Sequence, residues 1–239
     1  MKKTGITSAG LLIMALASGS GSAAIVVTKV SNPAGTPNVN SDELEYASFV
    51  SSTDLLAGLV GTGGAWNANG SSADGLNDGV HGGDNNVSGL GALSGTAWAQ
   101  DGTTSFRIFS LGPGANGTGF NITGIQSIAA WSGSGFANQK YEVLIHFVDD
   151  ADFTLLTTVD HQPHANSGGG ATKVNITDNA GLLATGVDAI RFNILDTTSS
   201  GGGVVMREID VFGSAAPVPE PSAALLGALG LLALLRRRR

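Results

Sequence analysis

Few side chains in this 239-residue chain occur at the spacings that are typical of catalytic or metal sites. In His161-Gln162-Pro163-His164 the histidines lie three apart, whereas a helical zinc-protease motif needs them four apart with a glutamate base, and Pro163 breaks a helix. The acidic residues at 149–152 are adjacent in the sequence and fit the turn of a hairpin. A glycosidase instead needs two carboxyls that face each other across a cleft, so this run is not interpreted as a glycosidase site. No serine stands in a Gly-x-Ser-x-Gly elbow, so no enzyme activity is predicted.

Composition and spacing exclude further chemistries. The chain has no cysteine, which excludes disulfides, thiol nucleophiles and zinc–thiolate sites. Gly112 to Gly117 matches Gly-x-Gly-x-x-Gly, but turn and strand residues follow where a dinucleotide site needs a helix. The net charge is −7, and nucleic acid binding is not expected because it needs a basic face.

The N-terminus is typical of a secretory signal. Lys2 and Lys3 precede the short apolar run 11–16, and small residues end at Ser22-Ala23-Ala24, which suits cleavage by signal peptidase after Ala24. The alternative, a retained membrane anchor, needs a longer apolar run than this one. We therefore expect residues 1–24 to be removed on export.

The C-terminus has three parts. Val218, Pro219, Glu220 and Pro221 precede an uncharged apolar segment, 223–235. Its length as a helix is about 20 Å at 1.5 Å per residue, short of the roughly 30 Å of a bilayer core. Four basic side chains then end the chain, and the positive-inside rule places them in the cytoplasm: Arg236, Arg237, Arg238 and Arg239. Without both ends, residues 25–219 keep six basic and eighteen acidic residues, a net charge of −12.

This order of parts resembles a PEP-CTERM sorting signal. The resemblance implies an exosortase-type membrane protease that recognises the Pro-Glu-Pro region and releases or transfers the body. It also implies a Gram-negative bacterium that makes extracellular polysaccharide. The precursor would be anchored in the inner membrane, and the body would reach the cell surface or extracellular matrix. A permanent single-pass transmembrane anchor is the alternative.

The body between these ends is predicted to be all β. Its second half shows short segments rich in β-formers, with turn residues between them. Tyr141, Val143, Ile145 and Phe147 alternate on one face of such a segment. Seven strands are predicted, at 105–111, 125–131, 140–148, 153–159, 171–176, 189–195 and 204–212. This pattern favours an antiparallel β-sandwich or jelly roll. The first half is less regular: a strand is predicted near Ile25, a short helix or strand pair at 42–59, and a long loop at 67–95.

The order of several short motifs resembles the galactose-binding-like, discoidin-type jelly roll. The motifs are Leu76-Asn77-Asp78-Gly79, Trp98, the segments 125–131 and 139–143, Val187 to Phe192, and Arg207 to Gly213. The loop after Gly79 is looser than in that family, and the family's terminal disulfide is absent. The resulting division is a signal peptide at 1–24, an N-terminal segment at 25–69 able to supply the first strands, the sandwich at 70–213, and the sorting signal at 214–239.

The same resemblance implies a structural calcium ion. Domains of this type often hold one between the Asp-Gly loop and a glutamate near the last strand, which here are Asp78 and Glu208, with Asp84 as a third side-chain ligand. A loop rich in Gly, Asp and Asn can complete the six to eight oxygens that calcium takes. The alternatives are an N-cap or a salt bridge from Glu208 to Arg191 or Arg207.

Carbohydrate contact is expected from aromatic side chains on loops at one end of the sandwich. Trp66 lies in the loop-rich half and is the predicted exposed aromatic residue, whereas Trp98 and Trp131 are predicted to pack inside. We therefore expect a non-catalytic exported protein that contacts extracellular polysaccharide. The alternatives are a purely structural surface protein without a ligand, and a hydrolase acting on the matrix.

Overall fold

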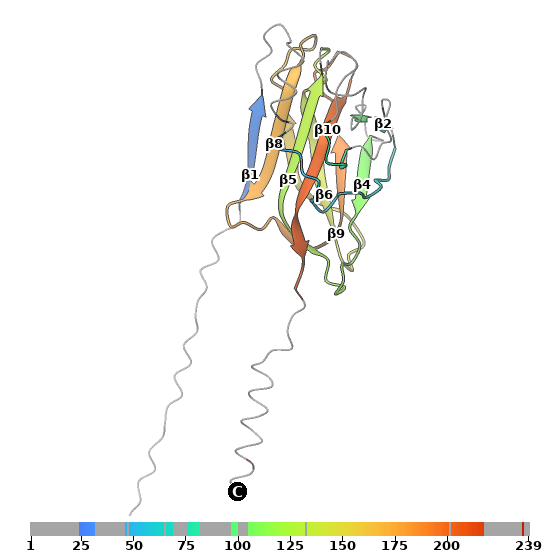
Figure 1. The fold of residues 1–239 in the computed structure, drawn as a ribbon, viewed down its shortest axis with the longest axis vertical. Coiled ribbons are helices and arrows are strands. Elements are labelled where there is room, and N and C mark those ends of the chain that lie inside the picture. Colours follow the sequence, from blue (N-terminus) through green and yellow to red (C-terminus); the bar gives the residue numbers. More distant parts are fainter. Residues whose placement is uncertain are drawn as a thin grey trace, which may run out of the picture.

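The computed structural model is an antiparallel β-sandwich (Figure 1). It describes residues 24–31, 46, 48–64, 66–68, 76–81, 97–99, 105–131, 133–200, 202–217 and 236, with the backbone alone at 66–68 and 97–99. Their strands are β1 (Ile25–Ser31), β2 (Trp66–Ala68), β3 (Ala97–Ala99), β4 (Phe106–Ser110), β5 (Phe120–Trp131), β6 (Gln139–Phe147), β7 (Thr154–His161), β8 (Gly170–Asp178), β9 (Ala184–Ile194) and β10 (Val204–Ala215). The predicted all-β class, an antiparallel β-sandwich, is confirmed, and each predicted strand of the second half is present.

The strands form two layers. One has the order β2-β3-β10-β5-β8-β1 and the other the order β4-β9-β6-β7, with every pairing antiparallel. The layers join where the start of β5 pairs with β9, at Phe120 opposite Val187. At the other side Lys29 Nζ on β1 donates to the carbonyl of Asp160 on β7 at 2.6 Å. The layers are therefore joined at two places, between β5 and β9 and between the edge strands β1 and β7.

The core lies between the layers. The alternation predicted from the sequence is confirmed: Tyr141, Val143 and Ile145 on β6 are buried, and so are Ile190 and Phe192 on β9. A buried polar row crosses this core. Ser127 Oγ donates to Gln139 Oε1 at 2.6 Å and lies 2.7 Å from the Tyr141 hydroxyl. Because these polar atoms satisfy each other, the row is compatible with a dry interior.

The two ends of the sandwich carry different parts of the chain. β1 begins and β10 ends at the lower end in Figure 1. Three loops that each connect one layer to the other meet at the opposite end, with described residues 133–138, 162–169, 195–200 and 202–203. Among the described residues no helix has the length and apolar character needed to cross a bilayer.

Parts of the first half of the chain differ from the secondary structure predicted for them. Residues 48–59 form successive turns instead of the predicted helix or strand pair, because their polar groups bond to β10 and to each other. The main-chain N–H of Leu55, for example, donates to the carbonyl of Val211 at 2.7 Å. The short strands β2 and β3 pair with each other and extend the first layer, although β2 lies in a region predicted as loop.

Candidate functional site

The loops at the end away from the start of β1 and the end of β10 are held together by one buried amide. Asn138 is 0% exposed, and its Nδ2 donates to the carbonyl of His164 at 2.9 Å and to Thr198 Oγ1 at 3.0 Å. Its Oδ1 accepts the main-chain N–H of His164 at 3.0 Å. A single side chain on the first loop thus fixes the second and third loops. The described residues of these three loops, 133–138, 162–169, 195–200 and 202–203, form the loop cluster.

Further contacts stiffen the loop cluster. The main-chain N–H of Gly135 donates to Gly168 at 2.7 Å, and that of Ser200 donates to Ser134 at 2.9 Å. Ser134 has a φ of 62°, a left-handed backbone that non-glycine residues seldom adopt. The sequence predicts a solvated loop around His164, but this residue is buried, with its ring packed against Gly170. Glycine is needed there, since a Cβ would enter the ring.

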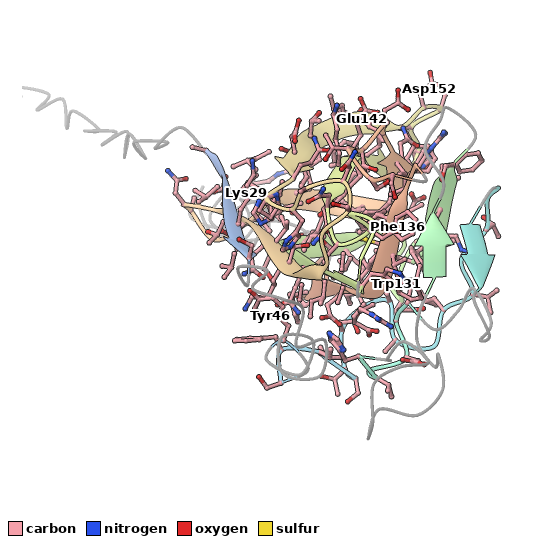
Figure 2. The ribbon with its side chains drawn as sticks, turned by 90° about the horizontal axis from the view of Figure 1, so that it is seen from above. Lys29, Tyr46, Trp131, Phe136, Glu142 and Asp152 are labelled. Carbon is pink, nitrogen blue, oxygen red and sulfur yellow. The ribbon has the colours of Figure 1, made fainter. Side chains whose placement is uncertain are left out.

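An aromatic pair lies beside the loop cluster. The rings of Trp131 and Phe136 are 6.5 Å apart at 62°, an edge-to-face contact, and both side chains are partly exposed (Figure 2). Beneath them the guanidinium of Arg207 lies 5.7 Å from the Trp131 ring centroid. The prediction that Trp131 packs fully inside is therefore wrong, because β5 ends at this residue and exposes it at the sheet margin. For Trp66 the structure describes only the backbone, on β2.

Four carboxylates gather on the outer side of β10. Glu208 and Asp210 are two apart on this strand and are 0% exposed, because the turns at 51–59 and 76–81 cover them. Glu208 Oε1 accepts the main-chain N–H of Gly79 at 3.1 Å, which brings the predicted pair Asp78 and Glu208 together. Asp54 and Asp210 complete this carboxylate cluster.

The turns are attached to β10 through the cluster itself. Asp54 Oδ1 accepts the main-chain N–H groups of Leu56 at 2.7 Å and Val211 at 3.2 Å. Asp210 Oδ1 accepts from Ser51 N–H at 3.2 Å, and its Oδ2 accepts from Gln126 Nε2 at 2.7 Å. The described arginines do not pair with Glu208: Arg207 Nε donates to the Ala130 carbonyl, and Arg191 lies over Phe106.

Burial and mutual repulsion shift the protonation of these groups. Burial, together with the nearby charge of Asp210, raises the pKa of Glu208 to about 10. Burial raises the pKa of Asp210 to about 6, and it also raises the pKa values of Asp54 and Asp78. Near pH 7 the ion-free protein therefore holds Glu208 in its neutral form.

Some oxygens of the cluster have unused acceptor capacity. Asp54 Oδ2, Asn77 Oδ1 and Glu208 Oε2 are buried without a hydrogen-bond partner. Buried oxygens are normally satisfied, and hard oxygens of this kind are the ligands that calcium takes. Within the described part of the chain, no three His, Asp or Glu side chains are grouped closely enough to hold a metal alone. A cation here would thus also need amide and main-chain oxygens.

Several predicted residues lie outside the described residues. They are Asp84 of the calcium set, Val218, Pro219, Glu220 and Pro221 of the sorting motif, and Arg237, Arg238 and Arg239 of the tail; Arg236 is described and exposed. Sequence reasoning missed Asp54 and Asp210. The i, i+2 spacing of Asp210 from Glu208 on one strand face was a usable signal, whereas no local pattern marks Asp54.

Comparison with known proteins gives low similarity throughout. No protein-family model and no curated protein matches the chain. Among solved structures, the family 32 CBM of NanJ from C. perfringens in complex with galactose is 13% identical at a TM-score of 0.43, covering 65% of this chain and 94% of that one. A GH31 CBM32-2 bound to GalNAc is also 13% identical at 0.43, with coverages of 64% and 96%. The chitosan-binding module 1 of a Paenibacillus sp. IK-5 chitosanase/glucanase is 13% identical at 0.39, covering 67% and 98%.

Proposed function

We propose that this chain is an exported, non-catalytic surface protein whose β-sandwich contacts extracellular polysaccharide. One observation carries the proposal: a stiff loop cluster with the partly exposed rings of Trp131 and Phe136 lies at the end of the sandwich opposite the start of β1 and the end of β10. Aromatic faces are the surfaces on which sugar rings pack. A rigid site also loses little conformational entropy on binding.

The positions at which β1 begins and β10 ends support presentation of the sandwich from a membrane. β1 begins and β10 ends at one end of the sandwich, next to the predicted signal peptide and sorting signal. A body held through its C-terminal tail would then point the loop cluster away from the bilayer. The galactose-binding-like assignment of the body belongs to this proposal as well.

Hydrolysis is the less favoured alternative because of where the carboxylates lie. Glu208 and Asp210 are 0% exposed beneath two turns, so no glycosidic oxygen reaches them. A glycosidase needs its acid and its base or nucleophile in contact with the sugar. Raised pKa values occur in catalytic sites, but they occur equally in buried clusters of purely structural carboxylates.

We also propose that the carboxylate cluster holds a structural calcium ion. Glu208 and Asp78 would supply side-chain oxygens, with Asp84 as the third ligand predicted from the sequence. The unsatisfied oxygens of Asp54 and Asn77 lie in the same turns. Calcium bound there would stabilise the ionised form of these carboxyl groups, which burial now disfavours, and it would tie the turns to β10.

Replacing Trp131 with Ala should weaken polysaccharide binding roughly tenfold, as expected from the loss of a stacking contact. The measurement is affinity electrophoresis of the exported protein through gels that contain the extracellular polysaccharide of its own host. Phe212→Ala is the matched control, because Phe212 is an exposed aromatic residue at the opposite end and should leave mobility unchanged. Equal losses in both variants would contradict a site at the loop cluster.

The sorting proposal predicts a shortened C-terminus. If an exosortase-type protease cuts near Val218 to Pro221, intact-mass spectrometry of the protein from native cells should find a body without the apolar segment. Cleavage by signal peptidase should likewise remove residues 1–24. A mass that still includes Arg236 to Arg239 would contradict processing and support a permanent anchor.

A further inference from the structure

The outer face of the second layer carries a preorganised guanidinium. Arg191 on β9 points away from the core, between Ile108 on β4 and Leu144 on β6, its cross-strand neighbours. Its side chain is partly exposed. Figure 2 shows Glu142 of this layer on the opposite side of the molecule from Tyr46. The carboxylate cluster lies on the outer side of β10 in the first layer, so the two faces are distinct.

Two contacts fix the plane of this guanidinium. Its Cζ lies 4.2 Å from the ring centroid of Phe106, a cation–π stack. Its Nε donates to Asn193 Oδ1 at 2.6 Å, and Asn193 Nδ2 donates in turn to Glu142 Oε2 at 3.1 Å. The ring and the amide therefore hold the group, and Glu142 is used to orient Asn193.

The two terminal nitrogens of Arg191 keep their donors available. No described carboxylate lies within salt-bridge distance of it, and the Asp188 carboxylate is taken by His146 Nδ1 at 2.6 Å. The other two arginines of residues 25–217, Arg107 and Arg207, are 7% and 0% exposed. Arg191 is thus the described arginine of the sandwich that solvent and ligands can reach.

We propose that Arg191 binds the carboxylate of a uronic acid residue in an acidic polysaccharide. A guanidinium fork matches a planar carboxylate through two parallel hydrogen bonds. A singly charged carboxylate also meets less repulsion than a phosphate from a body of net charge −12. The apolar side chains of Ile108 and Leu144 flank the fork and offer surface to the sugar ring. This inference rests on the proposed polysaccharide binding and specifies the class of polymer.

The test uses the exported protein and two forms of one polymer. In affinity electrophoresis, polygalacturonate should retard the wild-type protein at least tenfold more strongly than highly methyl-esterified polygalacturonate, whose carboxylates are masked. Arg191→Gln should remove most of this difference. Arg191→Lys keeps the charge without the fork and should behave like Arg191→Gln. Lys29→Gln removes an exposed charge on the other layer and should leave the difference in retardation between the two polymer forms unchanged.

The outcomes separate this inference from the proposed function. If the wild type binds both polymer forms equally, or if Arg191→Gln binds polygalacturonate as well as the wild type, the inference is overturned while polysaccharide binding stands. If the wild type binds neither these polymers nor its host's polysaccharide, both proposals fail. If poly-L-glutamate competes with polygalacturonate as strongly as free polygalacturonate does, the Arg191 guanidinium binds acidic peptides equally well, and the inference is also overturned. Melting temperatures unchanged by substitution establish that each variant is folded.

Discussion

Adding calcium to the chelator-treated protein should raise its melting temperature by about 5–10 °C. A ligand at a hundred times its dissociation constant stabilises the native state by about 2.7 kcal/mol, and in a domain of this size each kcal/mol shifts the melting temperature by roughly 2–4 °C. The stabilisation is expected because a divalent cation would neutralise carboxylates that are now buried side by side. Differential scanning calorimetry with calcium and with chelator measures it.

Matched variants connect this shift to the carboxylate cluster. Glu208→Gln keeps the shape of the side chain and its contact with Gly79 but removes the charged ligand, so its melting temperature should not respond to calcium. Glu142→Gln removes a carboxylate from the other layer and should respond like the wild type. Magnesium should have a smaller effect, because it prefers a compact octahedral shell that retains water. An unchanged wild-type melting temperature would refute the calcium proposal.

Without calcium, the protein should lose stability as the pH rises from about 5 to 9. The pKa of Glu208 is about 10 in the folded state and 4.5 in its ordinary state. Between these values the native state binds a proton that the unfolded state has released, so stability is greatest below pH 4.5 and falls as the pH rises toward 10. One such carboxyl contributes a slope of up to about 1.4 kcal/mol per pH unit.

Asp210 also makes the protein less stable as the pH rises, but over a lower pH interval than Glu208. Its folded pKa of about 6 exceeds the ordinary 3.8, so its contribution is lost as the pH rises between these values. Urea unfolding midpoints in chelator at pH 5, 7 and 9 measure the combined effect. Glu208→Gln should flatten the profile above pH 6. A wild-type midpoint that increases from pH 5 to 9 in chelator would contradict the protonated state of Glu208.

The strands were predictable because their side chains alternate. Tyr141, Val143 and Ile145 occupy every second position and all reach the core, and Ile190 and Phe192 repeat the pattern on β9. The turns at 48–59 gave no such signal. Their conformation depends on bonds to β10, more than 150 residues away, such as Ser51 to Asp210.

The candidate sites were predictable only in part, because they too depend on contacts between residues far apart in the sequence. The resemblance placed Asp78 with Glu208, and the structure brings both to one cluster. Asp54 joins them through long-range contacts that no local pattern encodes. The exposure of Trp131 follows from the position at which β5 ends. The orientation of Arg191 follows from the β4–β9 pairing, which places Phe106 beside it.

The most direct test of the proposed function is equilibrium binding of the exported protein to the extracellular polysaccharide of its own host, with the chain length of the polymer followed over time. We predict saturable binding, weakened by Trp131→Ala, with a polymer size distribution that stays constant for hours. Absence of binding, or shortening of the polymer by the wild-type protein, would contradict a non-catalytic polysaccharide-binding role.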